Sequence, residues 1–160
     1  MVKGFLQAKR NAALAVILSV SLLPSVVNAH EGATGIVKER MDAMKEMGDS
    51  MKIMGDMVKG KRPFERQAFV DGASIVSKNS PQIPDLFPQG SDGHKSDALP
   101  EIWQQWSQFE NKAQGTLDEA KKLQRVLDNG GDEKALKKQF VMLGKSCKSC
   151  HTDFRKKKKK

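Results

Sequence analysis

The residues best suited to chemistry form one short motif near the C-terminus, Cys147-Lys148-Ser149-Cys150-His151. Its two cysteines are the only cysteines of the 160-residue chain. Two thiols at this spacing can form thioether bonds to the two vinyl groups of one haem, and the imidazole that follows can ligate the iron. The motif therefore predicts one covalently attached haem c per chain, bound through Cys147 and Cys150, with His151 as an iron ligand.

Other roles for a C-x-x-C pair are a structural zinc site, a dithiol redox pair and a tight disulfide. A structural zinc site uses four ligands, and the chain adds only His30 and His94 to the motif. A thioredoxin-type dithiol lies in a βαβ unit, and no convincing strand pattern occurs near the motif. Haem attachment is therefore the interpretation that the sequence favours.

Residues 1–29 have the order of a secretory signal peptide: a basic start, an almost unbroken apolar run and small residues at the cleavage position. The apolar run is short for a membrane span and contains Pro24. We therefore expect cleavage after about Ala29 and export to the periplasm, where bacteria attach c-type haem. Residues 30–160 should form one domain without stable membrane insertion.

The charge of the chain lies mostly in its tail. Without residues 1–29, 25 Lys and Arg remain against 19 Asp and Glu, and residues 155–160 hold most of this excess. No basic stripe with interleaved aromatic residues occurs, so we expect no nucleic-acid partner. The basic tail is interpreted as a solvated, frayed helix end, and the alternative is that it docks to an acidic surface of a redox partner protein.

Four stretches of the remaining chain repeat apolar residues at helical spacing, and turn-forming residues separate them. They cover residues 33–58, 65–78, 100–127 and 133–155. Prolines, glycines and serines crowd residues 79–98, which we expect to form one long crossover. The pattern predicts an all-α protein, an antiparallel four-helix bundle with covalently bound haem c.

The last of these predicted helices carries the haem motif on its apolar side. At 100° per residue, Cys147, Cys150 and His151 lie within about 100° of Leu136 and Leu143. The haem should therefore fill the bundle interior. The first predicted helix directs a methionine seam to that interior, consisting of Met44, Met47, Met51 and Met54.

With this arrangement the chain resembles the cytochrome c′ family, the class II c-type cytochromes, from about residue 35 to residue 155. Members of this family carry C-x-x-C-H close to the C-terminus, on the last helix of a four-helix bundle. The other similar segments are Arg40 with Met44, Val58-Lys59-Gly60 with Pro63-Phe64, Pro100-Glu101-Ile102-Trp103, Gly144-Lys145-Ser146 and Phe154-Arg155.

The resemblance implies that Cys147 and Cys150 bind the haem and that His151 is the proximal iron ligand. It also implies that Arg40 lies near the haem edge, where a guanidinium can pair with a propionate. From the residues alone, Arg40 could equally be a solvated arginine at the margin of the seam. Arg155 would lie near the proximal side, although it also fits as part of the basic tail.

Met44 occupies the position that separates two subgroups of the family. An apolar residue there leaves the iron five-coordinate, whereas a methionine sulfur completes the coordination. The resemblance therefore favours the low-spin subgroup with His151 and Met44 as ligands, acting as a one-electron carrier. Two alternatives remain: Met44 packs in the core like its neighbours in the seam, or the protein is a five-coordinate cytochrome c′ that binds nitric oxide or carbon monoxide.

An enzyme is not expected, because the methionine seam offers no histidine or acid for proton transfer to a bound substrate. The outward faces of the predicted helices are strongly charged and lack a continuous apolar patch. The protein is therefore expected to be a monomer, with a homodimer as the alternative, and its partners are expected to be redox proteins.

Overall fold

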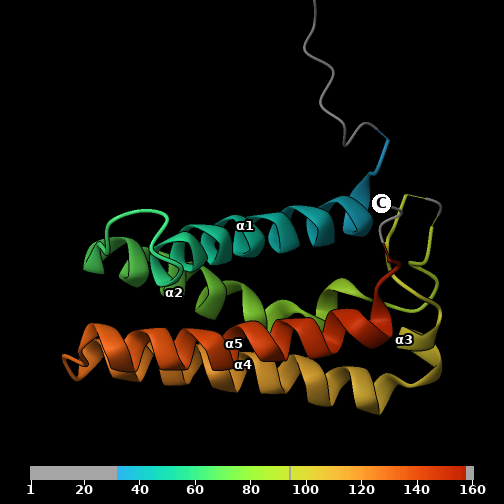
Figure 1. Ribbon diagram of the computed structural model, residues 1–160. Coiled ribbons are helices and arrows are strands. Elements are labelled where there is room, and N and C mark those ends of the chain that lie inside the picture. The colour runs from blue at the N-terminus through green and yellow to red at the C-terminus, as the bar shows by residue number, and fades with distance from the viewer. Residues whose placement is uncertain (1–31, 94, 158–160) are drawn as a thin grey trace, which may run out of the picture. The chain divides into compact units, whose positions relative to one another are not determined.

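The computed structural model describes residues 32–93 and 95–157. The helices are α1 (Gly35–Val58), α2 (Arg66–Asn79), α3 (Glu101–Gln104), α4 (Trp106–Asp128) and α5 (Glu133–Phe154), with two 3₁₀ turns, Ser80–Gln82 and Pro84–Leu86. The four long helices run alternately up and down, with α1 and α2 in one layer and α4 and α5 in the other (Figure 1). The predicted four-helix bundle is confirmed. The predicted signal peptide, His30 and His94 lie outside the described residues.

Helix ends follow the turn signals in the sequence. The side chain of Asp132 accepts a hydrogen bond from Ala135 N at 2.8 Å and caps the start of α5. Gly60 and Gly130 follow the ends of α1 and α4 with φ of 68°, a conformation that favours glycine. The four long helices begin and end within about two residues of their predicted bounds, apart from the start of α4.

One predicted helix is broken in the structure. Residues 100–127 were expected to be continuous, but Gln105 leaves helical geometry with φ −122° and ψ 44°. The break separates α3, which turns toward the crossover. There Trp103 Nε1 donates hydrogen bonds to the carbonyls of Phe87 and Pro88, both at 3.0 Å. This contact holds α3 in place. The sequence did not predict the break, because position 105 is a glutamine and not a glycine or proline.

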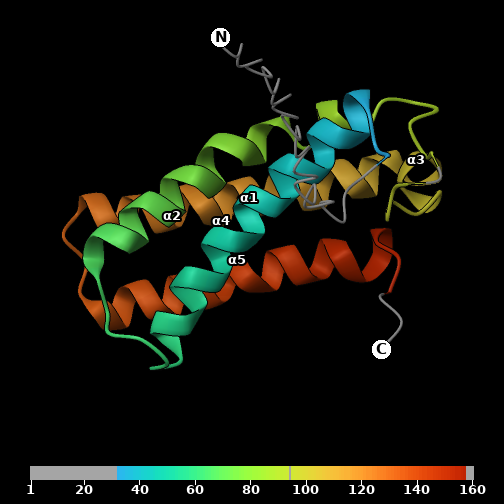
Figure 2. The ribbon, with the colours of Figure 1, turned by 90° about the horizontal axis from the view of Figure 1, so that it is seen from above.

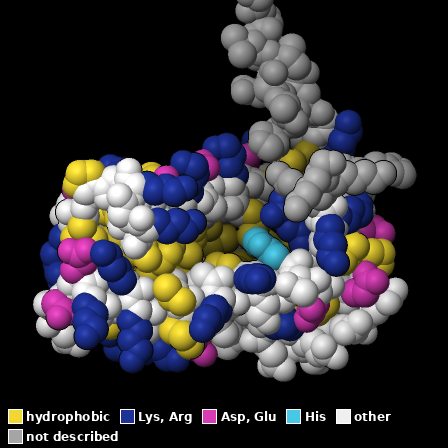
Figure 3. All heavy atoms as spheres, in the orientation of Figure 1, with side chains coloured by type: hydrophobic (Ala, Val, Ile, Leu, Met, Phe, Trp, Pro, Cys, Tyr) yellow, Lys and Arg dark blue, Asp and Glu magenta, His cyan; other side chains and the backbone are white. Residues whose placement is uncertain are grey.

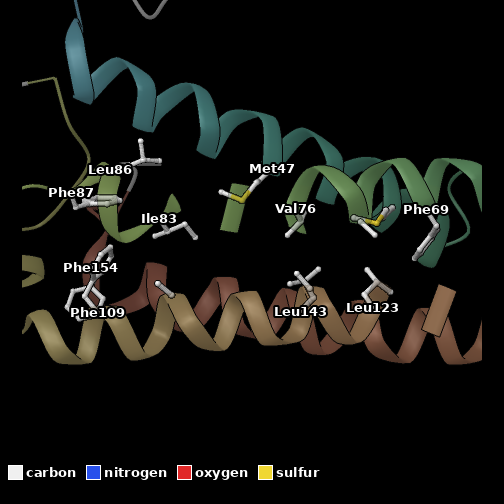
Figure 4. Packing of buried hydrophobic residues seen from close by; sticks show 14 of the residues in the cluster. Met47, Phe69, Val76, Ile83, Leu86, Phe87, Phe109, Leu123, Leu143 and Phe154 are labelled. Atoms are coloured by element: carbon white, nitrogen blue, oxygen red, sulfur yellow. The ribbon is translucent and has the colours of Figure 1, made fainter. Parts of the chain in front are cut away.

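The core has two ends: Leu123 and Leu143 lie with Phe69 at one, and a cluster of three phenylalanines lies at the other (Figure 4). Leu123, Leu136 and Leu143 are completely buried between the layers. At the other end, Phe87 and Phe154 meet the ring of Phe109 edge-on, at centroid distances of 4.9 and 5.5 Å. Each such buried side chain contributes about 2 kcal/mol. The aromatic cluster joins the crossover to α4 and to the end of α5.

Candidate haem-binding site

A groove between α1 and α5 is the natural place for a prosthetic group. These two helices share less contact than α1 shares with α2 or α5 with α4. Viewed from above, α1 crosses the bundle obliquely and its N-terminal half leaves α5 (Figure 2). The space-filling view shows a hollow there, with hydrophobic side chains on its wall and His151, the histidine that the structure describes, at its edge (Figure 3).

The register of α1 against α5 sets which residues face each other across the groove. Where the helices meet, Gly55 faces the ring of Phe140 and Gly144 faces Met51. Met44 lies seven residues before Met51, and His151 lies seven residues after Gly144. Because the helices are antiparallel, seven residues along each is the same axial distance of about 10 Å. Met44 and His151 therefore occupy corresponding positions along the two helices.

The motif residues lie on one side of α5, where a planar group could reach all three. Cys147 and Cys150 are half-buried free thiols one helical turn apart. Burial raises the pKa of both thiols, that of Cys150 to about 11, so both are protonated at neutral pH. Neither thiol is paired in a disulfide, so both are available to one haem.

His151 differs from its predicted position on the buried side of α5, because its side chain is exposed. It stands in the concave wall of the hollow, and desolvation by the surrounding protein, followed by the charge of Arg155, lowers its pKa. The neutral imidazole is the form that ligates iron. An accessible, neutral imidazole at the groove fits an iron ligand.

Met44 is half-buried and packs against the edge of the core, whereas Met47 and Met54 are 8% and 0% exposed. The methionine seam therefore contains two kinds of residue. Met47 and Met54 fill the core. Met44 lies beside the groove, at the position along α1 that corresponds to His151 on α5, where a thioether could approach a bound group.

Arg40 is 3% exposed, which excludes the solvated arginine that the sequence left open. Its Nη2 donates to the carbonyl of Ser91 at 2.7 Å, and its Nη1 lies 3.4 Å from the carbonyl of Leu86. Its Cζ lies 4.4 Å from the centre of the Phe87 ring, a cation–π contact. Among the described residues it has no carboxylate partner, so a haem propionate would supply the countercharge that this buried cation lacks.

Lys112 of α4 contacts the turn of α5 that carries the C-x-x-C-H motif. Lys112 Nζ donates to Ser149 Oγ at 2.7 Å and forms an ion pair with Asp153 at 2.8 Å. Ser149 lies between the two cysteines, and Asp153 lies two residues after His151. Nothing in the sequence pairs residue 112 with residues 149 and 153, so this contact was not predicted.

The first residues of the basic tail do not fray as predicted. Arg155 pairs with Ala98 in an isolated antiparallel bridge and forms an ion pair with Asp97 at 3.1 Å. Lys156 N donates to the carbonyl of Asp97 at 2.8 Å, and Leu99 N donates to the carbonyl of Phe154 at 3.1 Å. We call this pairing of residues 97–99 with residues 154–156 the C-terminal clip. It ties the end of α5 to the crossover.

A helical bundle with C-x-x-C-H on its last helix and a groove beside the histidine defines a c-type cytochrome of the bundle type. The model of the family described as Cytochrome C′ matches residues 35–155, and the chain belongs to that family. The family binds a covalent haem c, which the two free thiols and the accessible imidazole fit.

Named relatives cover most of the chain. Cytochrome c-556 of Agrobacterium fabrum is 35% identical over 79% of this chain and 84% of that protein. A solved cytochrome c prime from Shewanella frigidimarina matches with a TM-score of 0.72 and 32% identity, over 76% of this chain and 94% of that one. A nitric oxide complex of a leucine-to-alanine variant of cytochrome c prime from Alcaligenes xylosoxidans matches with a TM-score of 0.69 and 33% identity, over 77% and 94%.

The described residues contain no helix that is both long and apolar enough to cross a membrane. They also contain no group of three His, Cys, Asp or Glu side chains that could hold a bare metal ion.

Proposed function

We propose that this protein is a periplasmic haem c protein that binds nitric oxide or carbon monoxide at the side of the haem that faces α1. The observation that carries this proposal is the likeness to cytochrome c prime, because one of the similar solved structures is a nitric oxide complex. The comparisons thus support the gas-binding alternative better than the electron carrier that the sequence favoured.

The chain's own residues have separate roles in this proposal. Cys147 and Cys150 hold the haem by thioether bonds, and His151 ligates the iron from α5. Arg40 pairs with a propionate from its buried position beneath the crossover, where it is 3% exposed. When bound, haem c would supply an iron that can exchange one electron and bind a diatomic gas.

The remaining parts of the chain have supporting roles. Residues 1–29 direct export and are removed after about Ala29. Residues 30–160 form the haem-binding bundle and its basic tail. The protein acts as a binding protein or carrier, and no catalytic residue is assigned.

A second candidate function is one-electron transfer with His151 and Met44 as the two axial ligands. The observation in its favour is the position of Met44, half-buried beside the groove and at the position along α1 that corresponds to His151 on α5. Two strong-field ligands keep the iron geometry nearly unchanged on reduction, and a methionine ligand raises the reduction potential. Such a protein would be a low-spin, monomeric or homodimeric member of the family.

The visible spectrum of the holoprotein, oxidised and reduced, with and without carbon monoxide, separates the two functions. Gas binding predicts that carbon monoxide shifts the reduced Soret band of the wild type and of Met44→Leu to the same extent. Electron transfer predicts a sulfur-to-iron charge-transfer band that Met44→Leu abolishes, with carbon monoxide binding readily only to the variant. Met47→Leu is the control, because Met47 is 8% exposed in the core. A reduced wild type that does not bind carbon monoxide contradicts the first proposal.

A further inference from the structure

The solvent side of α5 carries a row of lysines along the haem-binding helix. The helix contains five lysines against two acids, Glu133 and Asp153. Four of the lysines are exposed and lie within about 80° of one another at 100° per residue, opposite Leu136 and Leu143. We call Lys134, Lys138, Lys145 and Lys148 the α5 lysine stripe.

The charges of this stripe are not neutralised by neighbouring acids. Among the described residues none of its four lysines forms an ion pair. The lysines of α1 behave differently, because each is paired four residues along the helix: Lys38 with Asp42, Lys45 with Asp49 and Lys52 with Asp56. The solvent sides of α1 and α5 therefore differ in charge, and α5 provides the positive surface.

Exposed apolar side chains lie within the stripe and beside it. Val141 and Met142, between Lys138 and Lys145 in the sequence, are 44% and 42% exposed. They are two of the three large hydrophobic side chains that are exposed in the described part of the chain. An apolar centre with a charged rim is the usual composition of a protein–protein interface.

The stripe is also close to the predicted haem. Lys148 lies inside the C-x-x-C motif, and Lys145 lies two residues before Cys147. An α-helix with its side chains is about 10 Å across. A protein seated on the stripe would be separated from the groove by the width of α5 alone.

We propose that the α5 lysine stripe, with Val141 at its centre and Met142 at its edge, is the docking surface for a redox protein with an acidic surface. The proposal rests on the haem attachment proposed above and adds the partner class and its place of contact. In the exchange the partner gives up one electron and the ferric iron becomes ferrous, and no covalent bond forms or breaks. Complementary charge would speed the encounter and orient the partner toward α5.

The test compares two triple variants of the holoprotein that lose the same charge. One is Lys138→Gln, Lys145→Gln and Lys148→Gln, on the stripe. The matched control is Lys38→Gln, Lys45→Gln and Lys52→Gln, on α1. The probe is a negatively supercharged fluorescent protein, its binding is measured by fluorescence anisotropy at low ionic strength, and its neutral parent is the blank.

The stripe variant should bind the acidic probe about tenfold more weakly, about 1.4 kcal/mol, because three exposed positive charges are lost from the contact. The α1 variant should lose less than about twofold, because its lysines are already neutralised within the helix. Equal weakening by the two variants would mean that net charge alone drives binding, and it would overturn the proposal.

A second arm distinguishes a protein partner from a membrane surface. Vesicles of phosphatidylglycerol and phosphatidylethanolamine in equal parts are used with the same variants. Tighter binding to these vesicles than to the acidic protein would overturn the proposed partner class. The Soret band of each sample reports haem attachment separately, so failure of the haem proposal is recognised independently of the docking result.

Discussion

The two helices that border the groove, α1 and α5, differ in their charge and in the chemistry of their side chains. α1 has five acids and four basic residues, and its lysines are paired within the helix. α5 has an excess of lysines, the two thiols and the imidazole. α1 therefore has a partly apolar inner side and a buried arginine, whereas α5 has the residues proposed to attach the haem and the exposed charge. The asymmetry suggests that the group held between them reaches partners from the α5 side.

Removing the attachment chemistry from α5 should have the largest effect. Cys147→Ser with Cys150→Ser should abolish covalent haem, because no other thiol exists in the chain. Mass spectrometry of the denatured protein should show the polypeptide without the added porphyrin. Each single variant retains one thiol and serves as the control. A double variant that keeps haem through denaturation would contradict the assignment of both cysteines.

The two faces of α5 should differ sharply in their effect on stability. Leu143→Ala should lower the free energy of unfolding by about 3 kcal/mol, because Leu143 is 0% exposed and leaves a cavity. Val141→Ala, two residues away and 44% exposed, should change it by less than about 0.5 kcal/mol. Urea denaturation of the holoproteins measures both. Similar losses would mean that the inner face of α5 does not carry the packing described.

On α1, the buried guanidinium should matter more than the paired lysines. Arg40→Met removes hydrogen bonds to Leu86 and Ser91 and should cost about 2 kcal/mol. The loss is limited because desolvation of the charge is relieved at the same time. Lys45→Gln breaks only an exposed ion pair with Asp49 and should leave the free energy of unfolding almost unchanged. The same urea series checks this order, and an equal cost for the two variants would refute it.

The smallest distinct effect is expected for the contact of Lys112 with Ser149 and Asp153. Lys112→Met should lower stability by about 1 kcal/mol, since Lys112 is partly buried and loses Ser149 and Asp153. It should also lower the midpoint potential of the haem, because a positive charge near the motif favours the reduced iron. Lys112→Arg should restore most of both properties. Redox titration is the measurement, and an unchanged potential would restrict Lys112 to a structural role.

Much of the fold could be predicted because its determinants are local. Apolar spacing, Asp132 as a cap and glycines after helix ends give the four long helices. The order of helices and one long crossover then leave few ways to bury the apolar faces.

The contacts that could not be predicted join residues far apart in the sequence. The break at Gln105 depends on a hydrogen bond from Trp103 to the crossover, and the fixed turn of α5 depends on Lys112. The exposure of His151 was not predicted. A helical wheel gives the direction of a side chain around its own helix, but it does not give the oblique path of the neighbouring helix α1. The helical period predicts which residues share one face of a helix. The packing of the other helices decides whether that face is buried.

The C-terminal clip has a consequence for local opening of the protein. A terminal helix normally unravels from its last turn, and that turn in this chain follows directly on His151. The backbone hydrogen bonds of Phe154 and Lys156 to Leu99 and Asp97 close this end. Amide hydrogens at the end of α5 should consequently exchange with solvent slowly, so the imidazole is held on a segment that rarely unwinds.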